Sequence, residues 1–232
     1  MASVTVHDPS RFQVRDGTLP AMTARANAHE TVLAHRAFCR VSGVLAMRIA
    51  AVRSGRLRRA GTLARHLRSY QRSLRGHQDA RDRLLWPALL ARCDLGADLV
   101  LRMQAHHVRV TATLAAVDAA LPDWAATADE DDRDRLVATL IEHRAVLAEH
   151  SDEEHRDLLP LAAEHLAAHE WQALRARTVA RLPRPRLLTY LGIVLAHADR
   201  GERRLVLTAL PRRARLIWYL LGWSRRPRWI RP

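Results

Sequence analysis

Apolar residues recur at three- and four-residue spacing in four long segments of the chain. These segments run from about Ala26 to Ser54, from about Leu57 to Cys93, from Asp98 to Leu121, and onward from about Asp132. Such spacing lines one face of an α-helix with apolar side chains, and that face must pack against other helices. The chain has no run of alternating β-branched residues that would indicate a strand. The pattern therefore predicts an all-α fold: an up-and-down four-helix bundle with a helical C-terminal extension.

Turn-forming residues set the limits of these segments. Gly55 and Gly96 lie between segments, and PDWAATADEDD separates the third from the fourth, with acidic residues that favour a helix N-terminus. After Pro160 the sequence predicts a shorter helix at Leu161 to Arg177, an extended break at RLPRPR, and helical pieces near Leu187 to Ala209 and Arg212 to Leu221. We expect three regions: a disordered lead-in over residues 1–25, the bundle over 26–175 and a basic extension over 176–232.

The positive charge of the chain is concentrated in that extension. All 38 basic residues are arginines, and the net charge is +14. From Arg175 to Pro232 there are 15 arginines against two carboxylates, so nearly all of the net charge lies there. Arginine beside the apolar run Leu216 to Trp223 favours peripheral contact of residues 211–232 with an anionic membrane surface. The alternative, which we prefer, is packing of Trp218, Leu220 and Leu221 on the bundle while the arginines face water. Nucleic acid is a less favoured partner, because no recognised binding motif accompanies the arginines.

The cysteines and the apolar runs favour a cytoplasmic protein. Cys39 and Cys93 stand alone without CxxC spacing, as expected for two small buried residues in a reducing compartment. No stretch of 18 or more apolar residues could span a membrane, and the N-terminal MASVTVHDPSRFQVRDG lacks the apolar core of a signal peptide.

Each of the four segments carries a histidine in register with its apolar stripe. These residues are His35, His77, His107 and His150. Equivalent positions on four bundled helices converge, and buried imidazoles are costly unless they are hydrogen-bonded or bound to a metal. Glu154 follows His150 by one helical turn, so both side chains can reach one cation. The pattern indicates a metal site in the core of the bundle.

Two segments of the chain share a layout: HQDARDRLLWP at residues 77–87 and HSDEEHRDLLP at residues 150–160. This repeat, with a histidine in each helix, resembles the hemerythrin-like HHE cation-binding domain over about residues 28–170. The segments HEWQAL and LPRRAR are similar to an actinobacterial-type version of that family. The resemblance implies a non-haem di-iron centre, held by histidines and bridging carboxylates of the four helices, that binds oxygen, nitric oxide or a related small molecule. It implies the following metal ligands: His35, His77, His107, His150 and Glu154.

The chain departs from the family pattern at Arg81. The family's first motif reads HHxxE, whereas here Gln78 follows His77 and Arg81 replaces the first bridging carboxylate. Thr111 stands one turn after His107, where some members carry a further ligand. Two iron ions need carboxylates to bridge them and to balance their charge. We therefore expect a centre with one or two iron ions, or a metal-free one.

The stripe of the second helix places Arg81 beside His77, although a long side chain could also reach solvent. In one hypothesis Arg81 pairs with Glu154 and fills the room of the metals, because a buried guanidinium needs a carboxylate partner. In the other, Arg81 turns away and some of the histidines hold one cation with Glu154.

Other polar residues near the motifs are expected to lie outside the site. His66 and His143 are 11 and 7 residues from His77 and His150, too far along a helix to share a metal. Asp79 and Asp82 point away from His77 unless the helix is distorted near Pro87. Six further histidines fall off the stripes or beyond the bundle: His29, His106, His155, His165, His169 and His197.

Two function classes remain open. The first is a protein that binds or senses a small molecule through iron. The second is a metal-free helical scaffold that uses Arg81 paired with Glu154 in place of a metal and contacts a partner through its basic tail. Whether the protein is an enzyme stays undecided, because no separate acid–base constellation stands out.

Overall fold

A computed structural model describes residues 18–93, 96–180, 191–192, 194–195, 198–209, 215–216 and 218–219. Within these ranges the chain is helical with no strand. The four long helices are α1 (Thr18–Ala50), α2 (Leu57–Ala80), α4 (Ala97–Thr127) and α5 (Glu130–Glu153). The shorter helices are α3 (Trp86–Leu90), α6 (Leu159–His165), α7 (Ala168–Ala180) and α9 (Arg200–Ala209). Two π-helical turns, η1 (Arg81–Leu85) and η3 (Glu154–Leu158), complete the described elements.

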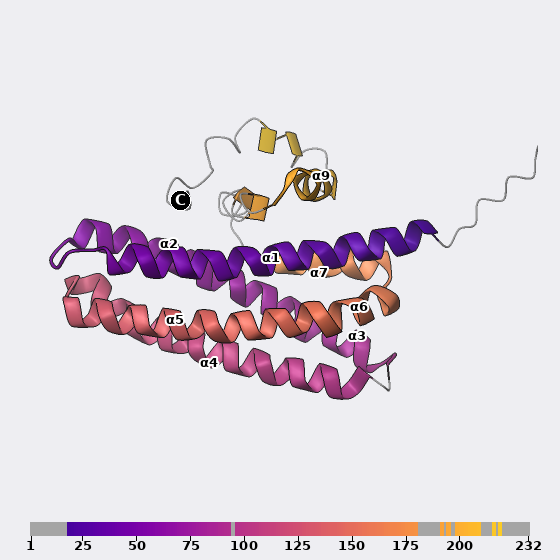
Figure 1. The fold of residues 1–232 in the computed structure, drawn as a ribbon, viewed down its shortest axis with the longest axis horizontal. Helices are drawn as coiled ribbons and strands as arrows, with labels where there is room; N and C mark the ends of the chain where they lie inside the picture. The colour runs from indigo at the N-terminus through magenta and orange to yellow at the C-terminus, as the bar shows by residue number, and fades with distance from the viewer. Residues whose placement is uncertain are drawn as a thin grey trace, which may run out of the picture.

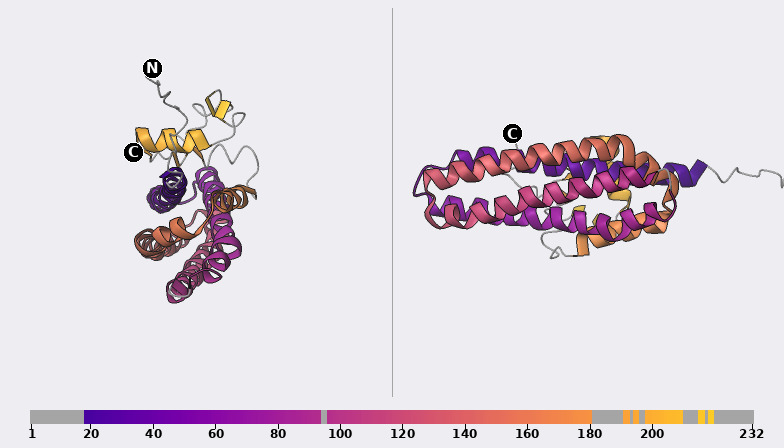
Figure 2. Two further views of the ribbon diagram at one scale, coloured as in Figure 1. Left: turned by 90° about the vertical axis from the view of Figure 1, so that its right-hand side faces the viewer. Right: turned by 90° about the horizontal axis from the view of Figure 1, so that it is seen from below.

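The long helices run side by side along the molecule (Figures 1 and 2). Each packs against two others, in the order α1, α2, α4, α5 and back to α1. The predicted all-α bundle with a helical C-terminal extension is confirmed. Two apolar clusters fill its interior. The larger is built from α1, α2, α4 and α5, and the second adds residues of α3, α6 and α7.

The predicted histidines lie between these two clusters on every long helix. On α2, Leu74 belongs to one cluster and Ala80 to the other, with His77 between them. On α4, His107 is placed in the same way between Met103 and Val110. The polar layer therefore crosses the bundle at one level, with apolar packing on both sides.

Two π turns interrupt otherwise continuous helices. Helix α2 passes through η1 into α3, and α5 passes through η3 into α6. Pro87 and Pro160 lie in the first turn of the helix that follows each π turn. A proline ring clashes with the carbonyl oxygen four residues earlier, and a widened turn relieves that clash. The helix is therefore distorted near Pro87, which is the condition under which Asp82 could approach the site, although its side chain stays half-exposed at the edge.

Several predicted boundaries are wrong. Helix α1 begins at Thr18, so residues 18–25 are helical rather than part of a lead-in, and residues 1–17 lie outside the described ranges. Helix α4 continues through Pro122 to Thr127, because Leu121 and Trp124 are buried on its apolar face. The turn before α5 consists of Ala128, with φ of 52°, and Asp129, whose carboxylate accepts two backbone hydrogen bonds at the helix start.

The helix expected over Leu161 to Arg177 is two helices. Helix α6 ends at His165 and α7 begins at Ala168, where the Glu170 carboxylate accepts a hydrogen bond from the Ala167 backbone. Within the piece expected from Leu187 to Ala209, α9 starts anew at Arg200, and Asp199 accepts a hydrogen bond from the Glu202 backbone. RLPRPR lies outside the described residues.

Part of the C-terminal extension packs against the outer face of α1. Figures 1 and 2 show α9 on the side of α1 that faces away from α4 and α5. An apolar cluster joins Leu33 and Ala37 to five residues of the extension: Val194, Leu195, Ala198, Val206 and Trp218. The predicted packing of Trp218 is confirmed, whereas Leu220, Leu221 and most of residues 211–232 lie outside the described ranges. No described helix is long and apolar enough to cross a membrane.

Candidate metal centre

Three buried side chains bring their possible metal-binding atoms together in the polar layer. They are His35 on α1, His150 on α5 and Glu154 at the start of η3, and their donor atoms lie within 4.8 Å of one another. Glu154 Oε2 lies 3.0 Å from His150 Nε2 and 3.6 Å from His35 Nε2. Two imidazoles and one carboxylate form a ligand set that suits a non-haem transition metal and leaves coordination positions open.

Arg81 points into the same layer. Its side chain is buried, and its Nε donates a hydrogen bond to Glu154 Oε1 at 2.8 Å. Solvent exposure of Arg81 is therefore excluded, and the predicted pair with Glu154 is present. The guanidinium contacts only Oε1, and buried Oε2, although it lies 3.0 Å from His150 Nε2, makes no hydrogen bond of good geometry among the described residues. The carboxylate thus neutralises the guanidinium with one oxygen and presents the other to the two histidines.

Electrostatics keep Glu154 ionised and His35 and His77 neutral. Burial is the largest single influence and raises the pKa of Glu154, but the charge of Arg81 together with the contributions of His35 and His150 outweighs it and holds that pKa well below its usual value. Burial lowers the pKa of His35 well below the usual value, with a smaller opposing effect from Glu154. Burial and the charge of Arg81 do the same to His77. A carboxylate and neutral imidazoles are the forms that bind metal ions.

His77 joins a hydrogen-bonded chain of side chains. Arg81 Nη1 donates to His77 Nδ1 at 3.3 Å, so the His77 proton is on Nε2, which lies 2.7 Å from His35 Nε2. His35 then donates from Nδ1 to His155 Nε2 at 2.9 Å. A cation at His35 Nε2 would have to displace the proton that His77 offers there. This competition weakens the site but does not remove any of its three donors.

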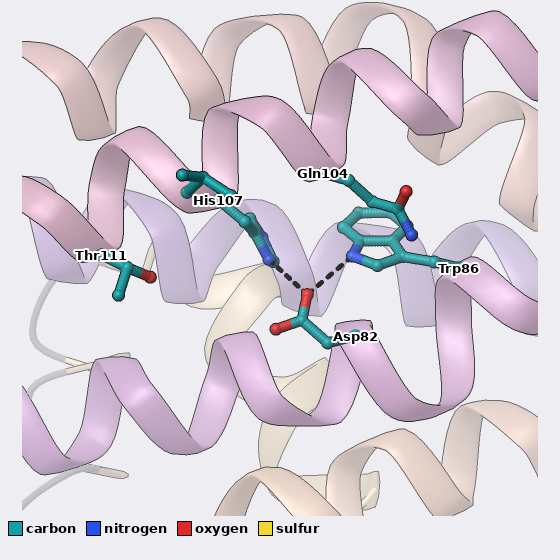
Figure 3. Close-up of a pocket in the computed structure, with 6 residues that line it drawn as sticks. Asp82, Trp86, Gln104, His107 and Thr111 are labelled. Atoms are coloured by element: carbon teal, nitrogen blue, oxygen red, sulfur yellow. Dashed lines mark hydrogen bonds and ion pairs between the residues drawn. The ribbon is translucent and has the colours of Figure 1, made fainter.

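His107 lies at the edge of the layer and is oriented by Asp82. Its Nδ1 donates to Asp82 Oδ1 at 2.7 Å, and Trp86 Nε1 donates to the same oxygen at 2.9 Å (Figure 3). The Nε2 of His107 is therefore the acceptor nitrogen, and it is buried without a hydrogen-bond partner among the described residues. A carboxylate behind an imidazole commonly fixes a metal-binding histidine. The ring of His107 lies 4.8 Å from that of His150, but His107 is not one of the three clustered donors.

A surface pocket borders this edge. Figure 3 shows it between Asp82 and helix α4, and its lining residues are Asp82, Trp86, Gln104, His107, Val108 and Thr111. Thr111 is exposed on the pocket wall and does not enter the polar layer.

Asp82 and His155 are the polar neighbours that sequence reasoning placed outside the site. Each stands five residues after a stripe histidine, a position about 140° round a regular helix. The π turns η1 and η3 begin one residue earlier and rotate both side chains toward the layer. The only signal in the sequence was the proline ten residues after each histidine. His155 stacks on His35 with ring centroids 5.0 Å apart.

The remaining histidines have other surroundings. His143 is buried and hydrogen-bonded to Tyr70, and His29 contacts Glu202. His106 lies 3.5 Å from Glu153, while His66, His165 and His169 lie outside the clustered donors. His197 lies outside the described residues. Cys39 and Cys93 are not bonded to each other.

Comparison with known proteins gives one match. A family model described as the hemerythrin HHE cation binding domain matches residues 27–162, which is more than half of the chain. No curated protein and no solved structure matches it.

Proposed function

Because the chain belongs to the hemerythrin HHE cation-binding domain family, we propose that it binds one transition-metal ion, with iron as the first candidate. The observation that carries the proposal is the cluster of His35, His150 and Glu154, whose donor atoms lie within 4.8 Å of one another in a buried layer. Glu154 Oε2 is buried beside His150 Nε2 and makes no well-formed hydrogen bond with any described residue, and a cation would satisfy it.

The donor set does not fit two bridged iron ions. Among the described residues, Glu154 is the sole carboxylate of the clustered donors, and the guanidinium of Arg81 occupies the place of the other bridging group. Two dications beside a fixed positive charge and one carboxylate would lack both bridges and charge balance. In our proposal Arg81 takes the electrostatic place of the second ion.

We further propose that the bound ion serves to bind or sense a small molecule such as oxygen or nitric oxide. Iron would supply the open coordination positions for such a ligand. The chain supplies the surroundings: His107 separates the layer from the surface pocket, and Asp82 holds its ring.

Metal analysis of the full chain tests the proposal. After loading with ferrous iron and removal of excess metal, we expect one iron per chain in the unmodified protein and none in Glu154→Gln. Arg81→Glu restores a second carboxylate and should raise the content to two. His165→Ala, outside the clustered donors, is the matched control and should keep one. Two ions in the unmodified protein, or one retained in Glu154→Gln, would contradict the proposal.

The second candidate is a metal-free scaffold that contacts a partner through its basic tail. The observation that favours it is the chain of hydrogen bonds from Arg81 through His77 and His35 to His155, which is complete without a metal. In that case the unmodified protein would fold, stay colourless and bind no iron, and Arg81→Glu would gain it.

A further inference from the structure

A second polar cluster lies in the apolar core of the bundle, apart from the candidate metal centre. Tyr70 on α2 and His143 on α5 are buried, and Thr113 on α4 is half-buried beside them. The Tyr70 hydroxyl lies 2.8 Å from His143 Nε2, and Thr113 Oγ1 lies 3.0 Å from His143 Nδ1. Three helices thus contribute one side chain each to a short hydrogen-bonded chain.

The direction of these hydrogen bonds follows from Thr113. Its hydroxyl oxygen lies 3.0 Å from the carbonyl oxygen of Val110, and when its single proton is donated there, its oxygen accepts from His143 Nδ1. A neutral imidazole with its proton on Nδ1 has its lone pair on Nε2. Tyr70 therefore donates its phenolic hydrogen to His143 Nε2. The phenol has a proton acceptor already in place.

Both groups are in the protonation states that this geometry needs. Burial lowers the pKa of His143 to about 4, so its imidazole is neutral at pH 7. Burial raises the pKa of Tyr70 far above its usual value, so the phenol keeps its proton. Loss of an electron alone would leave a buried cation radical on Tyr70, so the phenolic proton has to leave with the electron, and His143 Nε2 is within hydrogen-bond distance to take it.

One aromatic ring connects this cluster to the histidine layer. Phe38 lies edge-on to Tyr70 with ring centroids 6.0 Å apart and edge-on to His77 with centroids 5.3 Å apart. The rings of Tyr70 and His77 are thus joined through a single apolar neighbour. An oxidising equivalent in the histidine layer would meet Tyr70 through these contacts.

We propose that Tyr70 and His143 form a redox-active pair. A one-electron oxidant of the kind derived from peroxides takes one electron from Tyr70, and the phenolic proton moves to His143 Nε2. The products are a neutral tyrosyl radical, a histidinium that donates to Thr113 from Nδ1, and the oxidant reduced by one electron. The pair can thereby draw a damaging oxidant away from the core or supply an electron to the histidine layer.

The test uses the full chain without metal, so its result is independent of the proposed iron site. A photogenerated ruthenium(III) oxidant is applied to protein containing ring-deuterated tyrosine, and the frozen sample is studied by electron paramagnetic resonance. We expect a tyrosyl radical whose hyperfine pattern changes with deuteration. Tyr70→Phe should abolish it, whereas Tyr219→Phe, at an exposed position, and Tyr190→Phe should leave it unchanged.

His143→Gln separates proton transfer from simple packing. Glutamine can still accept the hydrogen bond of Tyr70, but it cannot take up its proton at neutral pH. The radical yield should fall at least tenfold in this variant. The proposal is overturned by a radical on tryptophan in the unmodified chain, by a tyrosyl signal that persists in Tyr70→Phe, or by an equal yield in His143→Gln.

Discussion

Arg81 and Glu154 form a buried ion pair, and Arg81 stands at the motif position for which the family resemblance implies a bridging carboxylate. The two side chains are 5% and 0% exposed, so neither charge is screened by solvent. Removing one partner from such a pair leaves the other charge buried without compensation, and this costs more than the pair itself contributes. The same reasoning explains why arginine suits position 81. Its charge compensates the buried charge of Glu154, which would otherwise have no counter-charge.

Arg81→Met should therefore destabilise the metal-free protein by about 3–5 kcal/mol, because Glu154 loses its counter-charge. The double change of Arg81→Met with Glu154→Gln should recover a large part of that loss. Urea unfolding at pH 7 in the presence of a chelator measures both values. If the double variant is no more stable than Arg81→Met, the uncompensated charge of Glu154 is not the cause of the lost stability.

His143 gives the fold a dependence on pH that can be separated from that of the metal centre. Burial lowers its folded-state pKa from 6.5 to about 4, so the unfolded chain binds its proton more readily. Above about pH 6.5 His143 is neutral in both states and does not reduce the free energy of unfolding. As the pH falls toward 4, that free energy decreases by about 3 kcal/mol in all. His143→Gln should flatten this part of the curve of unfolding free energy against pH. Parallel curves for the two proteins would contradict the assignment.

Helix α2 carries two glycines whose surroundings differ. Around Gly61 no atom lies within 4 Å of the position that a Cβ would take, whereas at Gly76 a Cβ would lie 2.8 Å from the carbonyl oxygen of Thr178 on α7. Gly76 therefore allows α7 to approach α2 closely. The contact matters for the site because Gly76 is adjacent to His77.

Alanine at the two glycines should have opposite effects. Gly61→Ala should stabilise the protein by about 1 kcal/mol, since alanine favours a helix and meets no obstacle. Gly76→Ala should destabilise it, because a backbone atom of α7 cannot move aside as a flexible side chain would. Urea unfolding of the pair, with matched chemistry on one helix, checks this. Equal effects of the two changes would argue against close packing of α7.

The helices could be predicted because their apolar stripes follow the period of a regular helix. Regular helix geometry could not predict that Asp82 contacts His107 and that His155 contacts His35, because both side chains reach these partners only through the π turns. The inward position of Arg81 was predictable because Arg81 is only the first residue of η1 and remains on the stripe of His77. The sequence could not predict that Glu154 directs one oxygen to Arg81 and the other to the histidines, because this depends on the orientation of one carboxylate. Helix α4 was extended by burial of Trp124, a tertiary effect that outweighed Pro122.

On the scale of the whole molecule, the C-terminal extension packs on the bundle through an apolar cluster. Among the described residues, α1 is the one long helix that contributes side chains to this cluster. Leu33 and Ala37 cover the inner side of that contact, and Trp218 is 7% exposed within it. Glu202 adds contacts to His29 and Arg36. The candidate metal ligands of the histidine layer all lie in the bundle, within the residues that match the family model. Metal binding and the attachment of the extension should therefore be separable.

Removal of residues 211–232 should test this separation and the proposed membrane contact together. The shortened chain loses Trp218, so we expect a lower melting temperature, while its iron content should equal that of the full chain because all three donors remain. If the arginine-rich tail binds anionic lipid, flotation with vesicles containing phosphatidylserine should fall strongly on truncation and on raising the salt concentration. Trp218→Ala alone should lower the melting temperature but retain flotation. Equal flotation of the full and shortened chains would remove the membrane role, and loss of iron on truncation would show that the extension supports the site.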